Sequence, residues 1–203
     1  HKLAAVLGFL ALLVGVMATS NLGFVFGSLT ARPFFHGIYF PTFLVVSGIA
    51  GGAALLLVIY NIIYKFNIPD QFKDAMNSLG KLMGLCISIM IFLYFWKIIS
   101  SLYTEPKEAY DAVMVLLSGP LYFNFWIGEV LMALVLPLVL LVVSKAKEIK
   151  TMGLAGLTFL IGMFFTRYDF IVAGQLPPMR AGNEGSGVEA INGLMHYTPS
   201  SGE

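Results

Sequence analysis

Five stretches of this 203-residue chain are apolar over the length that a membrane crossing requires. An α-helix rises about 1.5 Å per residue, so about 20 apolar residues cover a hydrocarbon core of roughly 30 Å. Open strands are excluded there, because their unpaired backbone groups would find no water. We therefore expect an all-α transmembrane helical bundle, with spans at about 3–19, 38–64, 82–99, 122–143 and 152–172.

The share of charged residues agrees with lipid as the main solvent of the chain. Charged side chains make up 11% of it, against roughly a quarter in a typical soluble domain. Residues 1–176 form the predicted bundle, and the composition then shifts to Gly, Pro, Ser and Asn over 177–203. Such a segment cannot bury enough apolar surface to fold alone, so we interpret it as a frayed terminus or as an arm that becomes ordered on a partner protein.

The distribution of lysines and arginines predicts the orientation, because basic residues in short loops stay in the cytoplasm. With five spans, one side of the membrane holds seven of them and the other side holds three. The larger set is Lys2, Lys65, Lys73, Lys81, Lys145, Lys147 and Lys150, and the smaller set is Arg32, Lys107 and Arg180. We expect the tail and the loops at 20–37 and 103–111 to be extracytoplasmic, with the chain in the inner (cytoplasmic) membrane.

Four ionisable side chains fall inside the predicted spans, where such groups are usually paired or functional. They are Lys97, Glu129, Arg167 and Asp169. Counted from the cytoplasmic helix ends at about 1.5 Å per residue, the first three lie roughly 21 to 23 Å up. Opposite charges at one height on neighbouring helices can neutralise each other, so we expect Glu129 to pair with Arg167 or Lys97.

Three interpretations of this charged layer stay open. The first is an ion-pair network that only fixes helix packing. The second is a proton relay through Glu129, Arg167 and Asp169. The third is a polar wall beside a quinone head group. The candidate residues near a quinone are Arg167, Tyr122, Tyr168 and Lys97.

Aromatic side chains near the predicted span ends are interpreted as an interfacial belt, where rings with one polar edge lie at head-group level. The residues of this predicted belt are Tyr39, Tyr60, Tyr64, Tyr94, Trp96 and Tyr103.

Other residue types exclude several classes of protein. The single cysteine, Cys86, leaves no disulfide framework and no thiolate cluster, so we expect no metal in this chain. Haem-b subunits hold haem through intramembrane histidines, whereas the three histidines here are His1 and His196 near the termini and His36 in a loop. The chain also has no phosphate-binding loop and no basic patch suited to nucleic acid.

Several short motifs resemble the NrfD-like family of integral membrane subunits, which includes polysulfide-reductase and hydrogenase-associated proteins. The match runs from about Ala31 to Gln175. Its motifs are Ala31-Arg32-Pro33-Phe34-Phe35-His36-Gly37, Tyr39-Phe40-Pro41-Thr42-Phe43-Leu44, Gly51-Gly52-Ala53-Ala54, Phe125-Trp126-Ile127-Gly128-Glu129 with Pro137-Leu138, Arg167-Tyr168-Asp169 and Ala173-Gly174-Gln175.

The resemblance implies a membrane subunit that exchanges electrons between quinone, either menaquinone or ubiquinone, and an extracytoplasmic ferredoxin-like iron–sulfur subunit. It implies further subunits of a redox complex as partners, and no haem or metal in this chain. Arg32 and His36 are expected to help dock the partner. The five spans are expected to correspond to the C-terminal portion of longer family members.

Two other functions remain open from the residues. Glu129, Arg167 and Asp169 are also the side chains that a small transporter or proton-conducting membrane protein would use, although the chain lacks the paired repeats of many carriers. A purely structural assembly subunit is the other alternative. Quinol-dependent electron transfer with a co-purified iron–sulfur partner favours the redox function, whereas solute movement in liposomes favours a transporter.

Overall fold

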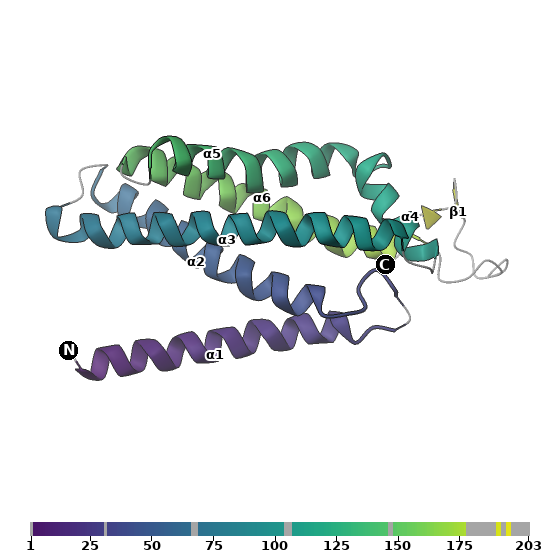
Figure 1. Ribbon diagram of the computed structural model, residues 1–203, viewed down its shortest axis with the longest axis horizontal. Helices are drawn as coiled ribbons and strands as arrows, with labels where there is room; N and C mark the ends of the chain where they lie inside the picture. The colour runs from purple at the N-terminus through teal and green to yellow at the C-terminus, as the bar shows by residue number, and fades with distance from the viewer. Residues whose placement is uncertain are drawn as a thin grey trace, which may run out of the picture.

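The chain folds as an all-helical bundle, as predicted. The computed structural model describes residues 2–30, 32–65, 69–103, 107–145, 148–177, 190–191 and 194–195. Within these ranges, five helical segments are long and apolar enough to cross a membrane. Figure 1 shows the long helices extending along the long axis of the molecule.

Four of the spans are single helices, and the fourth span in chain order is made of two consecutive segments. The single helices are α1 (Lys2–Gly27), α2 (Tyr39–Ile63), α3 (Asp70–Tyr103) and α6 (Ile149–Gln175). The composite span is η1 (Asn124–Val135), a π-helix, followed by α5 (Leu136–Val143). The short helix α4 (Lys107–Leu117) precedes it. The strands β1 (Ala190–Ile191) and β2 (Leu194–Met195) pair antiparallel.

Two helices extend beyond the spans expected from the sequence. Helix α1 continues to Gly27 instead of stopping at residue 19, and α3 begins at Asp70, well before residue 82. The last turns of α1 are held by close packing on the start of α2: a Cβ at Gly23 would collide with the backbone of Pro41. This contact lets the helix extend beyond its uniformly apolar stretch.

Helix α6 is central and α1 is peripheral. Half of the most apolar stretch of α6 is buried inside the protein, against 6% of that of α1. Helix α6 packs against α2, α4, α5 and η1, whereas α1 packs mainly on α2. In Figure 1, α1 lies close to α2 near Gly27 and diverges from the bundle toward its N-terminus.

The π-helix η1 lies directly on α6. A Cβ at Gly162 of α6 would overlap the backbone of Ala133, so only glycine allows this approach. A π-helix bonds residue i to i+5; it is rare and is frequently found at functional sites. Pro137 follows it at the start of α5 and has no N–H to continue the helical ladder.

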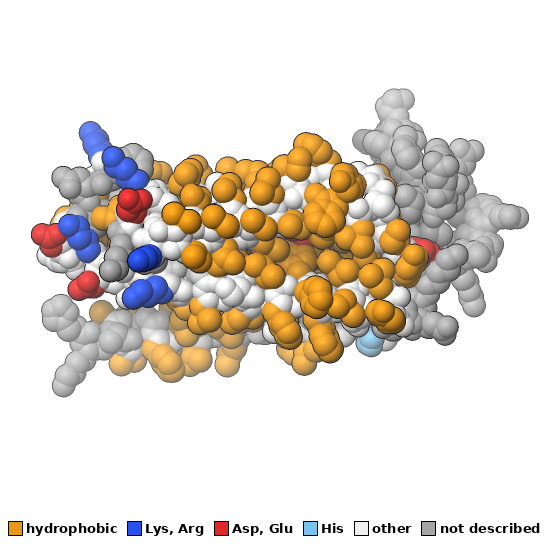
Figure 2. Space-filling view, turned by 45° about the horizontal axis from the view of Figure 1, so that its top comes forward, with side chains coloured by type: hydrophobic (Ala, Val, Ile, Leu, Met, Phe, Trp, Pro, Cys, Tyr) orange, Lys and Arg blue, Asp and Glu red, His pale blue; other side chains and the backbone are white. Residues whose placement is uncertain are grey.

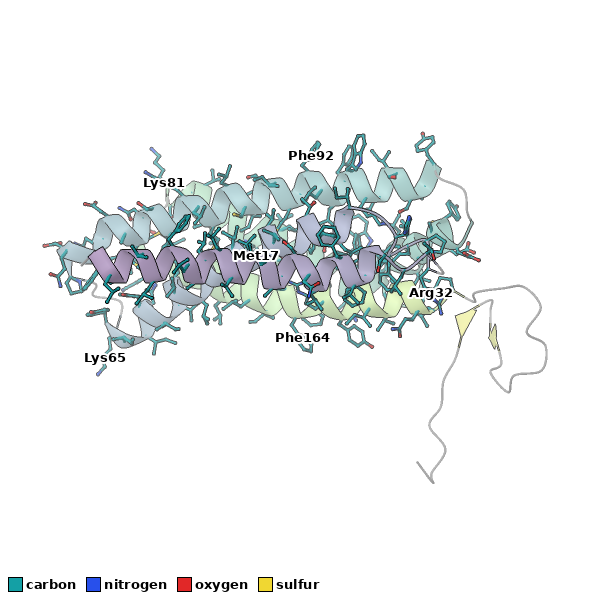
Figure 3. All side chains as sticks on the ribbon, turned by 90° about the horizontal axis from the view of Figure 1, so that it is seen from below. Met17, Arg32, Lys65, Lys81, Phe92 and Phe164 are labelled. Carbon is teal, nitrogen blue, oxygen red and sulfur yellow. The ribbon has the colours of Figure 1, made fainter. Side chains whose placement is uncertain are left out.

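The outer surface divides into an apolar belt and two ends of different charge. Figure 2 shows hydrophobic side chains over the middle of the molecule and basic side chains, with acidic ones among them, gathered at one end. In Figure 3, Phe92 and Phe164 point outward from the belt, Lys65 and Lys81 lie toward one end, and Arg32 lies at the other. We call these the lysine-rich end and the α4 end. The exposed lysines of the lysine-rich end are Lys65, Lys73, Lys81, Lys145 and Lys150.

The expectation that the tail is frayed or docked on a partner falls mostly outside the described residues. Of 177–203, the structure describes Pro177 and the two short strands. Arg180 and Lys147, which belong to the two sets of basic residues, also lie outside them.

Candidate functional site

The centre of the candidate site is a pair of buried carboxyl groups, Glu129 of η1 and Asp169 of α6. Both side chains have no solvent-exposed surface. They lie beside each other, close enough to interact electrostatically. None of the four carboxyl oxygens has a hydrogen-bond partner among the described residues. We call these two residues the carboxyl pair. A buried pair of this kind is stable only if it carries protons or other compensation, because charge in an apolar interior is costly.

Polar groups from three other parts of the bundle surround the carboxyl pair. The Tyr94 hydroxyl of α3 faces Glu129, and the Tyr39 hydroxyl of α2 lies in the same region. Asn124, the first residue of η1, faces Asp169. The tyrosine hydroxyls approach their neighbours without reaching hydrogen-bond geometry, and in the described part of the chain neither has a bonded partner.

Stacked aromatic rings hold the tyrosines in place. Tyr94 stacks on Phe170 with 5.7 Å between ring centroids, and Tyr39 stacks on Phe43 at 5.5 Å. Phe43 also contacts Phe170 edge to face at 5.0 Å. These rings fix both tyrosine hydroxyls on the side of the bundle where the carboxyl pair lies.

A cavity of about 250 Å³ has Phe170 in its lining, whereas Tyr94 and the carboxyl pair do not line it. Its walls are almost entirely apolar; Arg167 is the charged residue in the lining, and its guanidinium donates a 2.9 Å hydrogen bond to the Ser47 hydroxyl. Residues of α1, α2 and α6 line the cavity, together with Phe35 of the loop between α1 and α2. Helices α1 and α6 have little direct contact with each other. Its lining residues are Leu22, Phe26, Phe35, Phe40, Leu44, Arg167, Phe170 and Ile171. We call it the Arg167 cavity.

The expected pairing of Glu129 with Arg167 or Lys97 is not present. The one ion pair within the described ranges joins Lys73 and Asp70 at 2.6 Å on the surface of α3. Residues two apart on a helix point in different directions, so Arg167 turns toward α2 while Asp169 turns toward η1. The interpretation of this layer as an ion-pair network is therefore wrong.

Lys97 instead contacts the loop between α1 and α2 at the α4 end. Its ammonium group donates a 2.7 Å hydrogen bond to the Phe34 carbonyl and lies 4.9 Å from the centroid of the Phe34 ring. It also lies over the rings of Tyr39 and Phe40. Lys97 thus fastens the loop between α1 and α2 to α3.

Arg32 fastens the other side of the same loop. Its guanidinium donates a 2.6 Å hydrogen bond to the Pro177 carbonyl, just beyond α6. The Phe35 ring of this loop occupies the space beside Gly174, where a Cβ would collide with it. His36, the other predicted docking residue, is exposed at the α4 end.

The two tyrosines predicted near a quinone lie on the outer surface of the bundle. Tyr122 is 54% exposed and Tyr168 is 48% exposed, and neither lines the Arg167 cavity. Of the predicted site residues, the structure therefore brings together Glu129 and Asp169, whereas Arg167 binds Ser47 and lines the cavity.

Sequence reasoning missed Tyr94, which was assigned to the aromatic belt. Tyr94 is buried, with its hydroxyl beside Glu129. Its place nine residues before the end of α3, at Tyr103, was the available signal, since this depth is too great for a head-group contact. Ser47, Asn124 and Phe170 were also missed, because nothing in the sequence distinguishes them from packing residues.

Five apolar helical spans define a multi-pass membrane protein. The interior of its bundle holds two carboxyl groups without hydrogen-bond partners among the described residues. Within the described residues, no group of three histidine, cysteine, aspartate or glutamate side chains is placed to hold a metal ion. The family described as Polysulphide reductase, NrfD, matches residues 1–178. The chain therefore belongs to this family.

One curated relative is a selenate reductase subunit of Mesobacillus selenatarsenatis. It is 28% identical over 201 residues, which cover 98% of this chain and 46% of the relative. The chain thus spans about half the length of the curated relative that it matches.

Proposed function

We propose that this chain is part of the membrane subunit of a quinone-linked reductase complex, in which it exchanges electrons between membrane quinol or quinone and an iron–sulfur subunit. The observation that carries the proposal is that Phe170 both lines the Arg167 cavity and stacks on Tyr94, whose hydroxyl faces Glu129 of the carboxyl pair. A quinone needs an apolar site with few hydrogen-bond donors, and it needs nearby groups that can take or give protons.

The Arg167 cavity fits the head group of such a substrate. Ligand pockets usually measure about 300–1,000 Å³, so a cavity of about 250 Å³ suits a ring-sized head group whose isoprenoid tail remains in lipid. Arg167 uses one N–H in its hydrogen bond to Ser47, and a guanidinium has five N–H donors. The guanidinium is therefore suited to donate also to a quinone carbonyl oxygen.

The carboxyl pair supplies the proton chemistry. Oxidation of a quinol releases both of its electrons and both of its protons; the electrons go to the iron–sulfur centre of the partner and the protons to the protein. Tyr94 lies between the cavity and Glu129, because its ring stacks on Phe170 and its hydroxyl faces the carboxyl. This order of groups supports coupling of quinone turnover to proton movement through Glu129.

The distribution of basic residues supports an orientation in the membrane, and the curated relative supports the proposed partner subunits. The lysine-rich end fits the cytoplasmic side of the inner membrane, which supports an orientation with the α4 end outside. The exposed His36 at the α4 end is available to a ferredoxin-like partner, whereas Arg32 already binds Pro177. The relative is named as part of a selenate reductase, which supports a place among further subunits of a redox complex.

The test compares two substitutions in the complete complex with short-chain benzoquinol and naphthoquinol as substrates. Arg167→Gln should raise KM by about 10-fold or more, because hydrogen bonds from charged groups contribute about 1.5–3 kcal/mol. Tyr168→Phe on the outer surface should leave KM unchanged. The matched pair separates the cavity from the surface tyrosine as the place where quinol binds.

Two results would count against the proposal. If the wild-type complex oxidises neither quinol, the chain has another function, and solute uptake in liposomes would then point to a transporter. If Arg167→Gln and Tyr168→Phe both behave as wild type, quinol does not bind in the Arg167 cavity.

A further inference from the structure

The carboxyl pair lies near one end of the bundle. Asp169 is six residues before the end of α6 at Gln175, which is about 9 Å along the helix axis. In the other direction, Asp169 is twenty residues from the start of α6 at Ile149, or about 30 Å. The pair is therefore much closer to the α4 end than to the lysine-rich end.

Apolar side chains fill the bundle between the carboxyl pair and the lysine-rich end. Met83 and Ile87 of α3, Leu57 of α2 and Phe159 and Met152 of α6 are all fully buried there. Water enters an interior only where polar groups can bind it. This half of the bundle offers a proton no continuous route through the described side chains.

Thr158 and Asn61 are buried polar side chains of that half, and each donates to a carbonyl of its own helix, although the Asn61 Oδ1 has no partner among the described residues. The Thr158 hydroxyl donates to the carbonyls of Leu154 and Ala155, at 3.1 and 3.0 Å. Asn61 donates to the Leu57 carbonyl at 2.8 Å and packs against Gly153, about 24 Å along α6 from Asp169. These groups are too far apart to relay a proton to the carboxyl pair.

Polar groups continue from the carboxyl pair toward the α4 end. Asn124 faces Asp169 and is partly exposed, since it is the first residue of η1. Tyr94 is only 6% exposed, and its unbonded hydroxyl is directed at Glu129 within the described part of the bundle. An unbonded hydroxyl facing an unbonded carboxyl fits a protonated carboxyl group, because its O–H can donate to a neighbouring oxygen and no charge is left in the apolar interior.

We infer that the carboxyl pair holds a proton and exchanges it with water at the α4 end by way of Asn124, while the half toward the lysine-rich end is closed to it. The inference rests on the proposed function only for the source of the proton, which is the quinol. Each quinol then delivers its protons to the same side as the α4 end. This route therefore carries no proton across the membrane.

The first test measures access from each side and needs no quinol. Cys86, the only cysteine of this chain, is replaced by alanine, and single cysteines are introduced by Asn124→Cys and Thr158→Cys in membranes that contain the complete complex. A charged, impermeant thiol reagent is applied to vesicles of either sidedness. His36→Cys and Lys81→Cys, both at exposed positions, mark the α4 end and the lysine-rich end.

Asn124→Cys should react at least 10-fold faster from the side that labels His36→Cys. Thr158→Cys should react from neither side. Reaction of Thr158→Cys from the side that labels Lys81→Cys would overturn the inference, because that result shows a water path through the apolar half. So would equal labelling of Asn124→Cys from both sides.

The second test follows the proton itself by infrared spectroscopy of the C=O band of protonated carboxyl groups. Glu129→Gln should reduce this band, and Asn124→Leu should slow its hydrogen–deuterium exchange at least 10-fold. Thr158→Val should leave the exchange rate unchanged. Exchange that is unaffected by Asn124→Leu, or slowed by Thr158→Val, would show that the proton leaves by another route.

The two tests distinguish the inference from the proposed function. If quinol oxidation is absent but labelling and exchange follow the expected pattern, the proposed function is wrong and the proton site at the α4 end stands. If quinol is oxidised normally and Asn124→Leu changes nothing, the proposed function stands and the inferred route is wrong.

Discussion

The Phe170 ring stacks on the Tyr94 ring with 5.7 Å between their centroids, and Phe170 also lines the Arg167 cavity. The hydroxyl of Tyr94 faces Glu129. The two stacked rings thus connect an apolar cavity with a buried acid. Arg167 and Ser47 belong to the cavity side and Glu129 to the other, so substitutions at the two places should have separable effects.

Replacing Glu129 by Gln should lower quinol turnover strongly while leaving the complex assembled. Glutamine keeps the size of the side chain but cannot take or give the proton, and a positioned acid or base contributes about 10²- to 10⁴-fold to rate. The measurement is quinol-dependent turnover of the purified complex. Asp74→Asn, at an exposed position of α3, is the control and should have no effect. Wild-type turnover in Glu129→Gln would mean that the carboxyl group has only a packing role.

Replacing Ser47 by Ala should weaken quinol binding without slowing chemistry at saturation. The Ser47 hydroxyl accepts the 2.9 Å hydrogen bond that orients Arg167, and hydrogen bonds from charged groups contribute about 1.5–3 kcal/mol, or about 10-fold or more in affinity. KM for short-chain quinol should rise by that factor at unchanged kcat. Ser88→Ala is the matched control, because Ser88 is exposed and bonds to the Gly84 carbonyl of its own helix. A fall in kcat with KM unchanged would contradict the orienting role.

Replacing Lys97 by Met should destabilise the α4 end. The substitution removes the 2.7 Å hydrogen bond to the Phe34 carbonyl and the cation–π contact with the Phe34 ring. These contribute roughly 1–3 and 0.5–2 kcal/mol. The Tm of the detergent-solubilised protein should fall, whereas Lys150→Met at an exposed position should not change it. Equal Tm values for the two variants would show that the Lys97 contact adds nothing to stability.

Replacing Gly162 by Ala should separate η1 from α6. A Cβ there would overlap the backbone of Ala133, and overpacking of this kind costs about 1–3 kcal/mol. Gly52→Ala is the control, because a Cβ at Gly52 meets no described atom within 4 Å. Thermal unfolding and turnover should both be impaired in Gly162→Ala alone. Similar behaviour of the two alanine variants would contradict the close approach.

Most of the fold could be predicted because bilayer thickness and apolar length are directly related. The five spans follow from that relation alone. The ends of α1 and α3 do not, since the last turns of α1 pack closely on α2 where Gly23 meets Pro41, and residues 70–81 extend α3 beyond its expected span. Tertiary contacts decide such ends.

The carboxyl pair could be predicted only in part. The depths of Lys97, Glu129 and Arg167 in their spans indicated a common polar layer, whereas the structure has Asp169 beside Glu129. The direction of the Glu129 side chain could not be predicted, because the π-helix η1 changes which residues share a face. Arg167 and Asp169 are two residues apart in the sequence, yet Arg167 binds Ser47 of α2 and Asp169 is fully buried.

Two of the cavity's walls, Leu22 and Phe26, belong to α1, the helix with the least support from the rest of the bundle. A detergent that displaces α1 from α2 would therefore open one side of the cavity and leave the carboxyl pair in place. Preparations stripped of native lipid would then lose quinol affinity first, and adding lipid back should restore it.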